Sequence, residues 1–227
     1  MIKNRSNNMP IFKGVNYDSY LKRLMDILLS VVLGLFFLPL GVILAVLIKL
    51  DSAGPVFADT PERVGKNGRL FKMFKFRSMV ANAHMMLRHD PKLKTLYAKY
   101  KKNSYKLAED PRVTNLGKIL RKHSLDEIPQ LVNVIIGHMS LVGPRAYYPD
   151  ELSNQQKKYP ETKKLVSKVL SIKPGITGFW QVSGRSAVNF DKRIAMDADY
   201  VEHRSLCYDI KILLVTPWAM ISGKGAV

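Results

Sequence analysis

The stretch ILLSVVLGLFFLPLGVILAVLI, from Ile27 to Ile48, carries no charged residue over its 22 positions. A helix of that length is about 33 Å long at about 1.5 Å per residue, which is enough to cross the hydrocarbon core of a bilayer. It is longer than the apolar core of a cleaved signal peptide, and no small-residue cleavage site follows it before Lys49. The sequence therefore predicts a membrane helix over residues 21–50.

Pro39 lies near the centre of this stretch, where a proline removes one backbone hydrogen bond and commonly kinks a helix. Basic residues flank the stretch on both sides, with Lys22 and Arg23 before it and Lys49 and Arg63 after it. A single crossing would put one basic flank on the wrong face under the positive-inside rule. A helix that enters, bends and returns to the same face satisfies the rule, so a kinked spanning helix and a re-entrant helix are the two alternatives.

The remainder of the chain is strongly basic. Its 227 residues include 36 Lys and Arg against 18 Asp and Glu, for a net charge of +18. This excess predicts a polyanionic partner, which would be nucleic acid, anionic lipid or a phosphorylated metabolite. An apolar content of 47% excludes a disordered chain, and the single cysteine excludes an intrachain disulfide. We expect a basic lead-in over residues 1–20 and one domain over residues 51–227.

The patterns after the membrane helix predict an α-rich α/β fold with a small sheet. The expected helices cover residues 83–107 with a break at Asp90-Pro91, and residues 116–121, 150–171 and 190–221. Leu70–Arg77 alternates apolar and basic residues as a half-buried strand does, with its cations on one face. The final helix is amphipathic and carries Trp218, so it either lies in the membrane interface or packs into its own domain.

Residues 113–148 contain only two acidic residues, the adjacent Asp126 and Glu127. Ser124 together with Glu127 matches a capping box at a helix start, and this structural role would account for the pair. A carboxylate kept ionised by Arg121 would instead be able to attack phosphorus and form an acyl phosphate. Its neighbour would then bind a divalent metal or transfer protons. The residues alone leave both roles open.

Two further motifs are less specific. The loop at residues 173–178 contains two glycines, but it matches neither the Walker pattern nor the dinucleotide-binding pattern. Asp197-Ala198-Asp199 has the form of the Asp-x-Asp metal motif of nucleotide-sugar glycosyltransferases. Its surroundings are helical, which argues against a metal site there.

Several segments occur in a specific order along the chain. They are the proline-containing membrane helix, Lys75–Met79, Asp110–Thr114, Arg121–Gln130, Met139–Arg145 and Lys173–Arg185. In this order the chain resembles the bacterial sugar transferases, the monotopic phosphoglycosyl transferases that act on polyprenyl phosphate. The insert over residues 83–110 and the ending Lys224–Ala226 are most similar to the undecaprenyl-phosphate galactose or glucose phosphotransferases. That branch usually carries a further N-terminal membrane domain, so we expect this chain to correspond to the catalytic domain only.

The resemblance implies the transfer of hexose 1-phosphate from a UDP-sugar to undecaprenyl phosphate, with UMP released. This is the first membrane step of exopolysaccharide, capsule or O-antigen assembly, at the cytoplasmic face of the inner membrane. Asp126 would be the nucleophile, Glu127 would support it, and both would bind Mg²⁺. The implied phosphate-binding residues are Lys75, Arg77, Arg121 and Arg145, and the implied nucleotide- or sugar-binding residues are Lys173, Gln181 and Arg185.

The resemblance also favours the re-entrant geometry, with the helix kinked at Pro39 and bound to membrane lipid. It favours galactose or glucose as the hexose and leaves the formation of a homo-oligomer open. The alternative is a membrane-anchored basic protein that binds nucleic acid or anionic lipid without catalysis, but this explains only the charge. No nucleic acid is expected, because no known binding signature accompanies the basic residues. A scaffold protein would explain only the apolar stretch.

Overall fold

The computed structural model describes residues 17–102, 105, 107, 109–183 and 188–222. Helices make up most of these residues, as the sequence predicted. The helices are α2 (Lys22–Asp51), α3 (Ala83–His89), α4 (Lys94–Lys102), α5 (Asn115–Lys122), α6 (Gln130–Ile135), α7 (Pro149–Lys158), α8 (Lys163–Val169), α9 (Phe179–Ser183), α10 (Phe190–His203) and α11 (Leu206–Ser222).

Two short sheets complete the fold within the described residues. Strands β1 (Arg63–Val64) and β2 (Leu70–Phe71) pair antiparallel, whereas β3 (Ser140–Val142) and β4 (Gly175–Thr177) pair parallel. The parallel pair lies in the main core, between α2 and α6 on one side and α11 on the other. Beside it two loops approach so closely that a Cβ on Gly175 would lie 2.1 Å from the backbone nitrogen of Gly143.

The strand predicted over Leu70–Arg77 is wrong beyond its first two residues, because only β2 forms. The side chain of Asn133 on α6 ends the strand. Its amide donates to the carbonyl of Lys72 at 2.8 Å, and its oxygen accepts from the backbone N–H of Phe74 at 2.8 Å. These bonds replace the ladder that a longer strand would need. The segment beyond therefore turns toward the interior.

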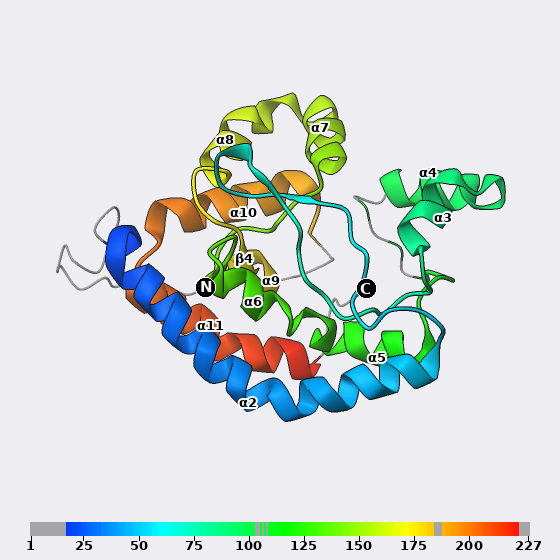
Figure 1. Cartoon of the computed structure of the whole chain (residues 1–227). Helices are drawn as coiled ribbons and strands as arrows, with labels where there is room; N and C mark the ends of the chain where they lie inside the picture. Colours follow the sequence, from blue (N-terminus) through cyan, green and yellow to red (C-terminus); the bar gives the residue numbers. More distant parts are fainter. Residues whose placement is uncertain (1–16, 103–104, 106, 108, 184–187, 223–227) are drawn as a thin grey trace.

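Helix α2 runs without interruption through Pro39 for 30 residues. Figure 1 shows it changing direction near its middle, in agreement with the bend predicted at the proline. Among the described residues, α2 is the one helix that is long and apolar enough to cross a membrane. Only 11% of its most apolar 18-residue stretch is buried. A core helix of a soluble protein would be mostly buried, so the exposed apolar surface of α2 fits a membrane anchor.

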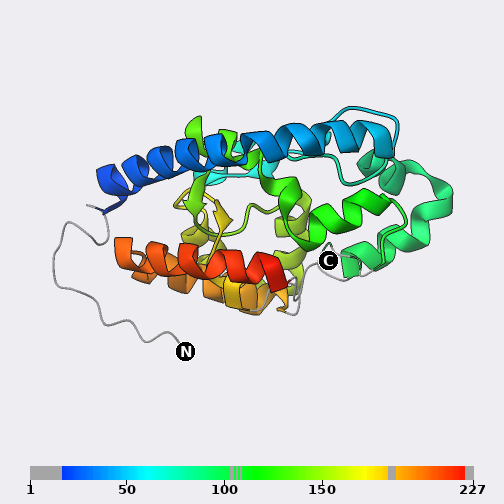
Figure 2. The same ribbon diagram turned by 90° about the horizontal axis from the view of Figure 1, so that it is seen from below.

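Two helices that carry exposed apolar residues, α2 and α11, lie on one side of the molecule (Figure 1). Helices α2 and α11 both run along the lower side in Figure 1, and Figure 2 shows them from below with α5 and α6 between them. On α11, Leu214, Trp218 and Ile221 are exposed while Ile212 is buried against the core. This helix therefore packs on its domain with one side and leaves Trp218 free for a membrane interface.

A buried polar cluster ties the start of α2 to α11. Asp209 on α11 is fully buried and accepts three hydrogen bonds. The donors are Lys22 Nζ at 2.5 Å, Tyr17 Oη at 2.7 Å and Tyr200 Oη at 2.7 Å. Because these donors come from residues far apart in the chain, the cluster fixes the position of the membrane helix relative to the core.

Candidate active site

The acidic pair lies in a single 3-10 turn, Leu125–Glu127, just after α5. Ser124, which precedes the turn, has a left-handed backbone with φ of 55° and makes no side-chain capping bond. A capping side chain requires an extended backbone at that position, so the predicted capping box does not form. The carboxylate of Glu127 contacts another partner instead.

That partner is Lys75. Its Nζ donates to Glu127 Oε1 at 2.6 Å and lies 3.6 Å from Asp126 Oδ2. The backbone N–H of Phe76 also donates to the carbonyl of Asp126 at 2.9 Å, which fastens the two segments together. Asp126 is buried, with 6% of its surface exposed. A partly buried ammonium therefore neutralises part of the charge of two adjacent carboxylates.

The two carboxyls differ in their pKa shifts. Burial raises the pKa of Asp126, and Glu127 adds to this, against the opposing charges of Lys75 and Arg121. Burial alone would also raise the pKa of Glu127, but the charge and hydrogen bond of Lys75, helped by Arg145 and Arg63, lower it. The sequence had suggested that neighbouring cations keep Asp126 ionised. In the structure burial outweighs these cations, so the pKa of Asp126 lies above its ordinary value. The two adjacent carboxyls therefore have pKa values that are shifted in opposite directions.

A cavity of about 450 Å³ opens beside the pair. Besides Arg77, five cationic side chains line it: Arg63, Lys75, Arg112, Arg121 and Arg145. Basic residues around a cavity of this kind suit the phosphates of a ligand. The structure thus brings three of the predicted phosphate-binding cations to the acidic pair and adds two that the sequence did not single out.

Arg77 also lies at the cavity wall, but its guanidinium is used elsewhere. All three of its nitrogens donate to the end of α2, to the carbonyls of Ile48, Ser52, Ala53 and Pro55 and to the hydroxyl of Ser52. These bonds satisfy carbonyls that a helix end leaves without intrahelical partners. We therefore describe Arg77 as the C-terminal cap of α2 and no longer include it among the phosphate ligands.

The residues predicted to bind the nucleotide or sugar have different positions relative to the cavity. Gln181 lines the cavity, and its amide donates to the carbonyl of Ile176 at 2.8 Å. Lys173 is not among the lining residues, and its pKa is lowered by burial and by the nearby Arg23 at the start of α2. Arg185 lies outside the described residues. Of the two that the structure describes, Gln181 alone lines the cavity that opens beside the acidic pair.

The insert adds aromatic residues to the cavity that sequence patterns did not indicate. Its two ends are joined by Arg112, which pairs with Asp110 at 2.6 Å and donates to the carbonyl of Ala83 at 2.9 Å. Tyr100 and Tyr105 then lie on the cavity wall with their ring centres 5.1 Å apart. Figure 1 shows the helices of this insert, α3 and α4, at one end of the molecule. Aromatic rings of this kind can stack against a sugar or a base.

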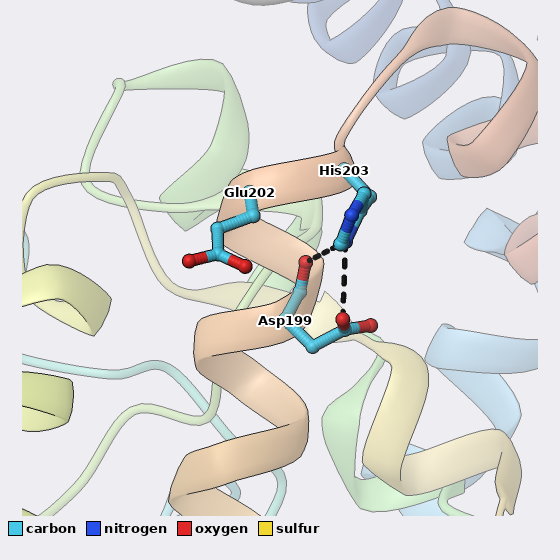
Figure 3. A group of neighbouring side chains, drawn as sticks. All are labelled: Asp199, Glu202 and His203. Atoms are coloured by element: carbon cyan, nitrogen blue, oxygen red, sulfur yellow. Dashed lines mark hydrogen bonds and ion pairs between the residues drawn. The ribbon is translucent and has the colours of Figure 1, made fainter.

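The two aspartates of the Asp-x-Asp motif do not share one site. Asp197 is fully buried, whereas Asp199 is exposed on the same helix. Figure 3 shows Asp199 beside Glu202 and His203, with His203 Nδ1 3.0 Å from the Asp199 carboxylate. This trio could hold a cation by spacing, but it is exposed and Glu202 also pairs with Lys168. The two aspartates therefore have different surroundings, one inside the domain and one at its surface.

Asp197 leads to a prediction about pH and stability. Burial raises its pKa from an ordinary 3.8 to about 7, although hydrogen bonds from Arg145 and Tyr147 and the charges of Arg193 and Arg145 oppose the shift. The unfolded chain loses this proton near pH 4 and the folded protein only near pH 7, so folding stability falls as pH rises between them. Between pH 4 and pH 8, the free energy of unfolding of wild type should therefore fall by up to about 4 kcal/mol relative to that of Asp197→Asn.

Denaturation of both proteins at each pH, in the same detergent, checks this expectation. The comparison isolates Asp197 because every other titrating group is common to the two proteins. Asp199→Asn serves as the matched control, since it changes an exposed carboxyl two residues away. A stability difference between wild type and Asp197→Asn that stays constant over this range would contradict the raised pKa.

Comparison with known proteins assigns the chain to a family. The model of the bacterial sugar transferase family matches residues 17–223, so the chain belongs to that family, a class of membrane-associated transferases. The chain is 40% identical over 211 residues to the undecaprenyl-phosphate galactose phosphotransferase of Salmonella typhimurium, covering 91% of this chain and 42% of that protein.

It is also 38% identical over 205 residues to the exopolysaccharide production protein ExoY of Sinorhizobium fredii, covering 90% of this chain and 87% of ExoY. A third relative is the UDP-glucose:undecaprenyl-phosphate glucose-1-phosphate transferase of Xanthomonas campestris, which is 36% identical over 224 residues. This chain spans 42% of the length of the Salmonella and Xanthomonas proteins.

Proposed function

We propose that this protein transfers hexose 1-phosphate from a UDP-sugar to undecaprenyl phosphate, with release of UMP, in the first membrane step of exopolysaccharide assembly. The observation that carries the proposal is the acidic pair bound to Lys75 beside a cavity that further cationic side chains line, among them Arg121 and Arg145. The family and the names of its relatives support the substrate class. Galactose and glucose are the hexoses that those names suggest.

In the first step, an oxygen of the Asp126 carboxylate attacks the β-phosphorus of the UDP-sugar. The bond between this phosphorus and the bridging oxygen breaks, and UMP leaves with that oxygen. The sugar phosphate stays on Asp126 as an acyl phosphate. Lys75 and Arg145 would stabilise the charge that builds up on the transferred phosphoryl group.

In the second step, a phosphate oxygen of undecaprenyl phosphate attacks the same phosphorus. The acyl phosphate bond breaks and Asp126 returns to its carboxylate form. The product is an undecaprenyl diphosphate sugar. The exposed apolar face formed by α2 and α11 would keep the site at the bilayer surface, where this acceptor is found.

The residues present fit a magnesium ion. Asp126 and Glu127 supply two carboxylates, which are hard oxygen ligands, and phosphate oxygens and water would complete the coordination that Mg²⁺ requires. Bound there, Mg²⁺ would neutralise phosphate charge and favour the ionised form of Asp126. Both carboxylates already face the ammonium of Lys75, which cannot serve as a metal ligand, so a metal bound without a phosphate ligand would be held weakly.

The test is a panel of UDP-sugars supplied to the purified protein with Mg²⁺ and undecaprenyl phosphate. We expect UMP release and a lipid-linked sugar with UDP-galactose or UDP-glucose. Salt-sensitive binding to anionic vesicles or to DNA without any turnover would favour the non-catalytic alternative. Removal of Mg²⁺ with a chelator should abolish turnover and leave the protein folded.

The proposal places the catalytic domain on the cytoplasmic face of the inner membrane, with α2 re-entrant. We therefore expect fusions of green fluorescent protein to either terminus to fluoresce in bacterial cells, and fusions of alkaline phosphatase to either terminus to be inactive. The physical reason is that basic residues flank the helix on both sides. Termini that report opposite faces would show that α2 spans the bilayer.

A further inference from the structure

The mechanism above does not use Asp197, although this carboxyl is fully buried behind the cavity. Its Oδ2 accepts the backbone N–H of Arg145 at 3.1 Å and the hydroxyl of Tyr147 at 3.2 Å. Its Oδ1 has no hydrogen-bond partner among the described residues. Arg145 follows the turn after β3, so one carboxylate on α10 holds the backbone of the loop that carries a cavity cation.

The side chain of Arg145 is held by aromatic rings. Its guanidinium carbon lies 5.5 Å from the ring centre of Trp180 and 5.9 Å from that of Tyr147. A second cation, Arg193, lies 4.9 Å from the same Trp180 ring and is buried, with Glu151 Oε1 3.6 Å away. Stacking on aromatic faces orients a guanidinium and leaves its N–H groups available for a phosphate.

Within the described part of the chain, Arg145 forms no ion pair with a carboxylate closer than 4.0 Å. It does act on the reaction centre, because its charge helps to lower the pKa of Glu127. The position of this charge therefore depends on two contacts. The Trp180 ring packs against the guanidinium of Arg145, and Asp197 accepts the backbone N–H of the same residue.

We infer that Asp197 is a positioning residue that holds Arg145 in place for the phosphate of the sugar nucleotide. The inference rests on the proposed function for the identity of that ligand. Asp197 acts through Arg145 and does not touch the substrate itself. An asparagine at this position keeps an oxygen acceptor for both hydrogen bonds, whereas a leucine of similar size keeps none.

The experiment compares Asp197→Asn, Asp197→Leu and Asp197→Ala in the full chain, with Asp199→Asn as the matched exposed control. Hydrogen exchange of the peptide that contains the Arg145 amide is measured first. We expect exchange about 10-fold faster or more in the leucine and alanine variants, because this amide loses its acceptor. The two asparagine variants should exchange at the wild-type rate, which rules out an effect of the charge alone.

The second measurement is the KM for the UDP-sugar. We expect it to rise about 10-fold in Asp197→Leu and to stay within about 2-fold of wild type in Asp197→Asn. In an Arg145→Ala background, Asp197→Leu should cause no further rise, because the two residues act as one unit. Equal rises in both backgrounds, or fast exchange with an unchanged KM, would overturn the inference.

The affinity for UDP, measured by calorimetry with the same variants, separates this inference from the proposed function. A wild-type protein that binds UDP but releases no UMP from any donor would refute the proposed function alone. Asp197→Leu should still weaken UDP binding about 10-fold in that case. Unchanged UDP binding in Asp197→Leu would refute the positioning role, whatever the outcome of the turnover assay.

Discussion

Asp126→Asn is expected to lower the rate of UMP release by at least about 10³-fold, because an amide oxygen cannot serve as the nucleophile. The substitution changes the shape of the side chain little, and the Lys75 contact with Glu127 at 2.6 Å remains. The fold should therefore survive, and a thermal melt of the variant would show this. Loss of turnover in a folded variant would then show that Asp126 is needed for the chemical step.

Mass spectrometry of the trapped protein gives the direct test of the same step. With a UDP-sugar and no lipid acceptor, wild type should carry one hexose phosphate on the peptide that contains Asp126. Glu127→Gln keeps the nucleophile, so it should form the same adduct more slowly. UMP release that persists in Asp126→Asn, or an adduct on a different residue, would show that another group attacks the phosphorus.

Asp209→Ala is expected to destabilise the protein by about 3–5 kcal/mol, which is the usual result of removing one partner of a buried ion pair. The change leaves Lys22 and the phenols of Tyr17 and Tyr200 without their common acceptor. For a chain of this size the melting temperature should fall by roughly 10 °C or more. Thermal denaturation in one detergent at fixed pH measures it.

Replacing both members of the pair distinguishes an unpaired buried charge from lost packing. Lys22→Met with Asp209→Leu removes both charges of this pair, so the double variant should be more stable than Asp209→Ala. Asp209→Asn keeps one acceptor oxygen and should fall between Asp209→Ala and wild type. If Asp209→Ala melts within about 2 °C of wild type, corresponding to less than about 1 kcal/mol, the cluster does not hold α2 to the core.

Local patterns predicted the helical elements well. The break at Asp90-Pro91 and the short helix that became α5 form close to their expected bounds, whereas the helical stretches expected over residues 150–171 and 190–221 are each divided, into α7 and α8 and into α10 and α11. Each depends on neighbours within a few residues, such as a proline that cannot continue a helix or an apolar period of one turn. The strand over Leu70–Arg77 failed because Asn133, far along the chain, takes over its backbone groups.

The roles of single residues were harder to predict than the elements that carry them. Arg77 and Lys173 lie in segments that match the family, yet one caps α2 and the other lies beside Arg23. The capping box had the right residues, but the left-handed backbone of Ser124 prevents it. A cation or a carboxylate looks the same in the sequence whether its partner is a phosphate, a helix end or another side chain.

The sequence by itself determined the long apolar helix, the strongly basic charge, the family and the adjacency of Asp126 and Glu127. These follow from hydrophobicity, charge and order along the chain. Only the tertiary structure decided that Lys75 neutralises the pair, that the insert adds tyrosines to the cavity, and that Asp197 supports Arg145. Such contacts join residues far apart in the chain, and both burial and pKa depend on everything packed around a group.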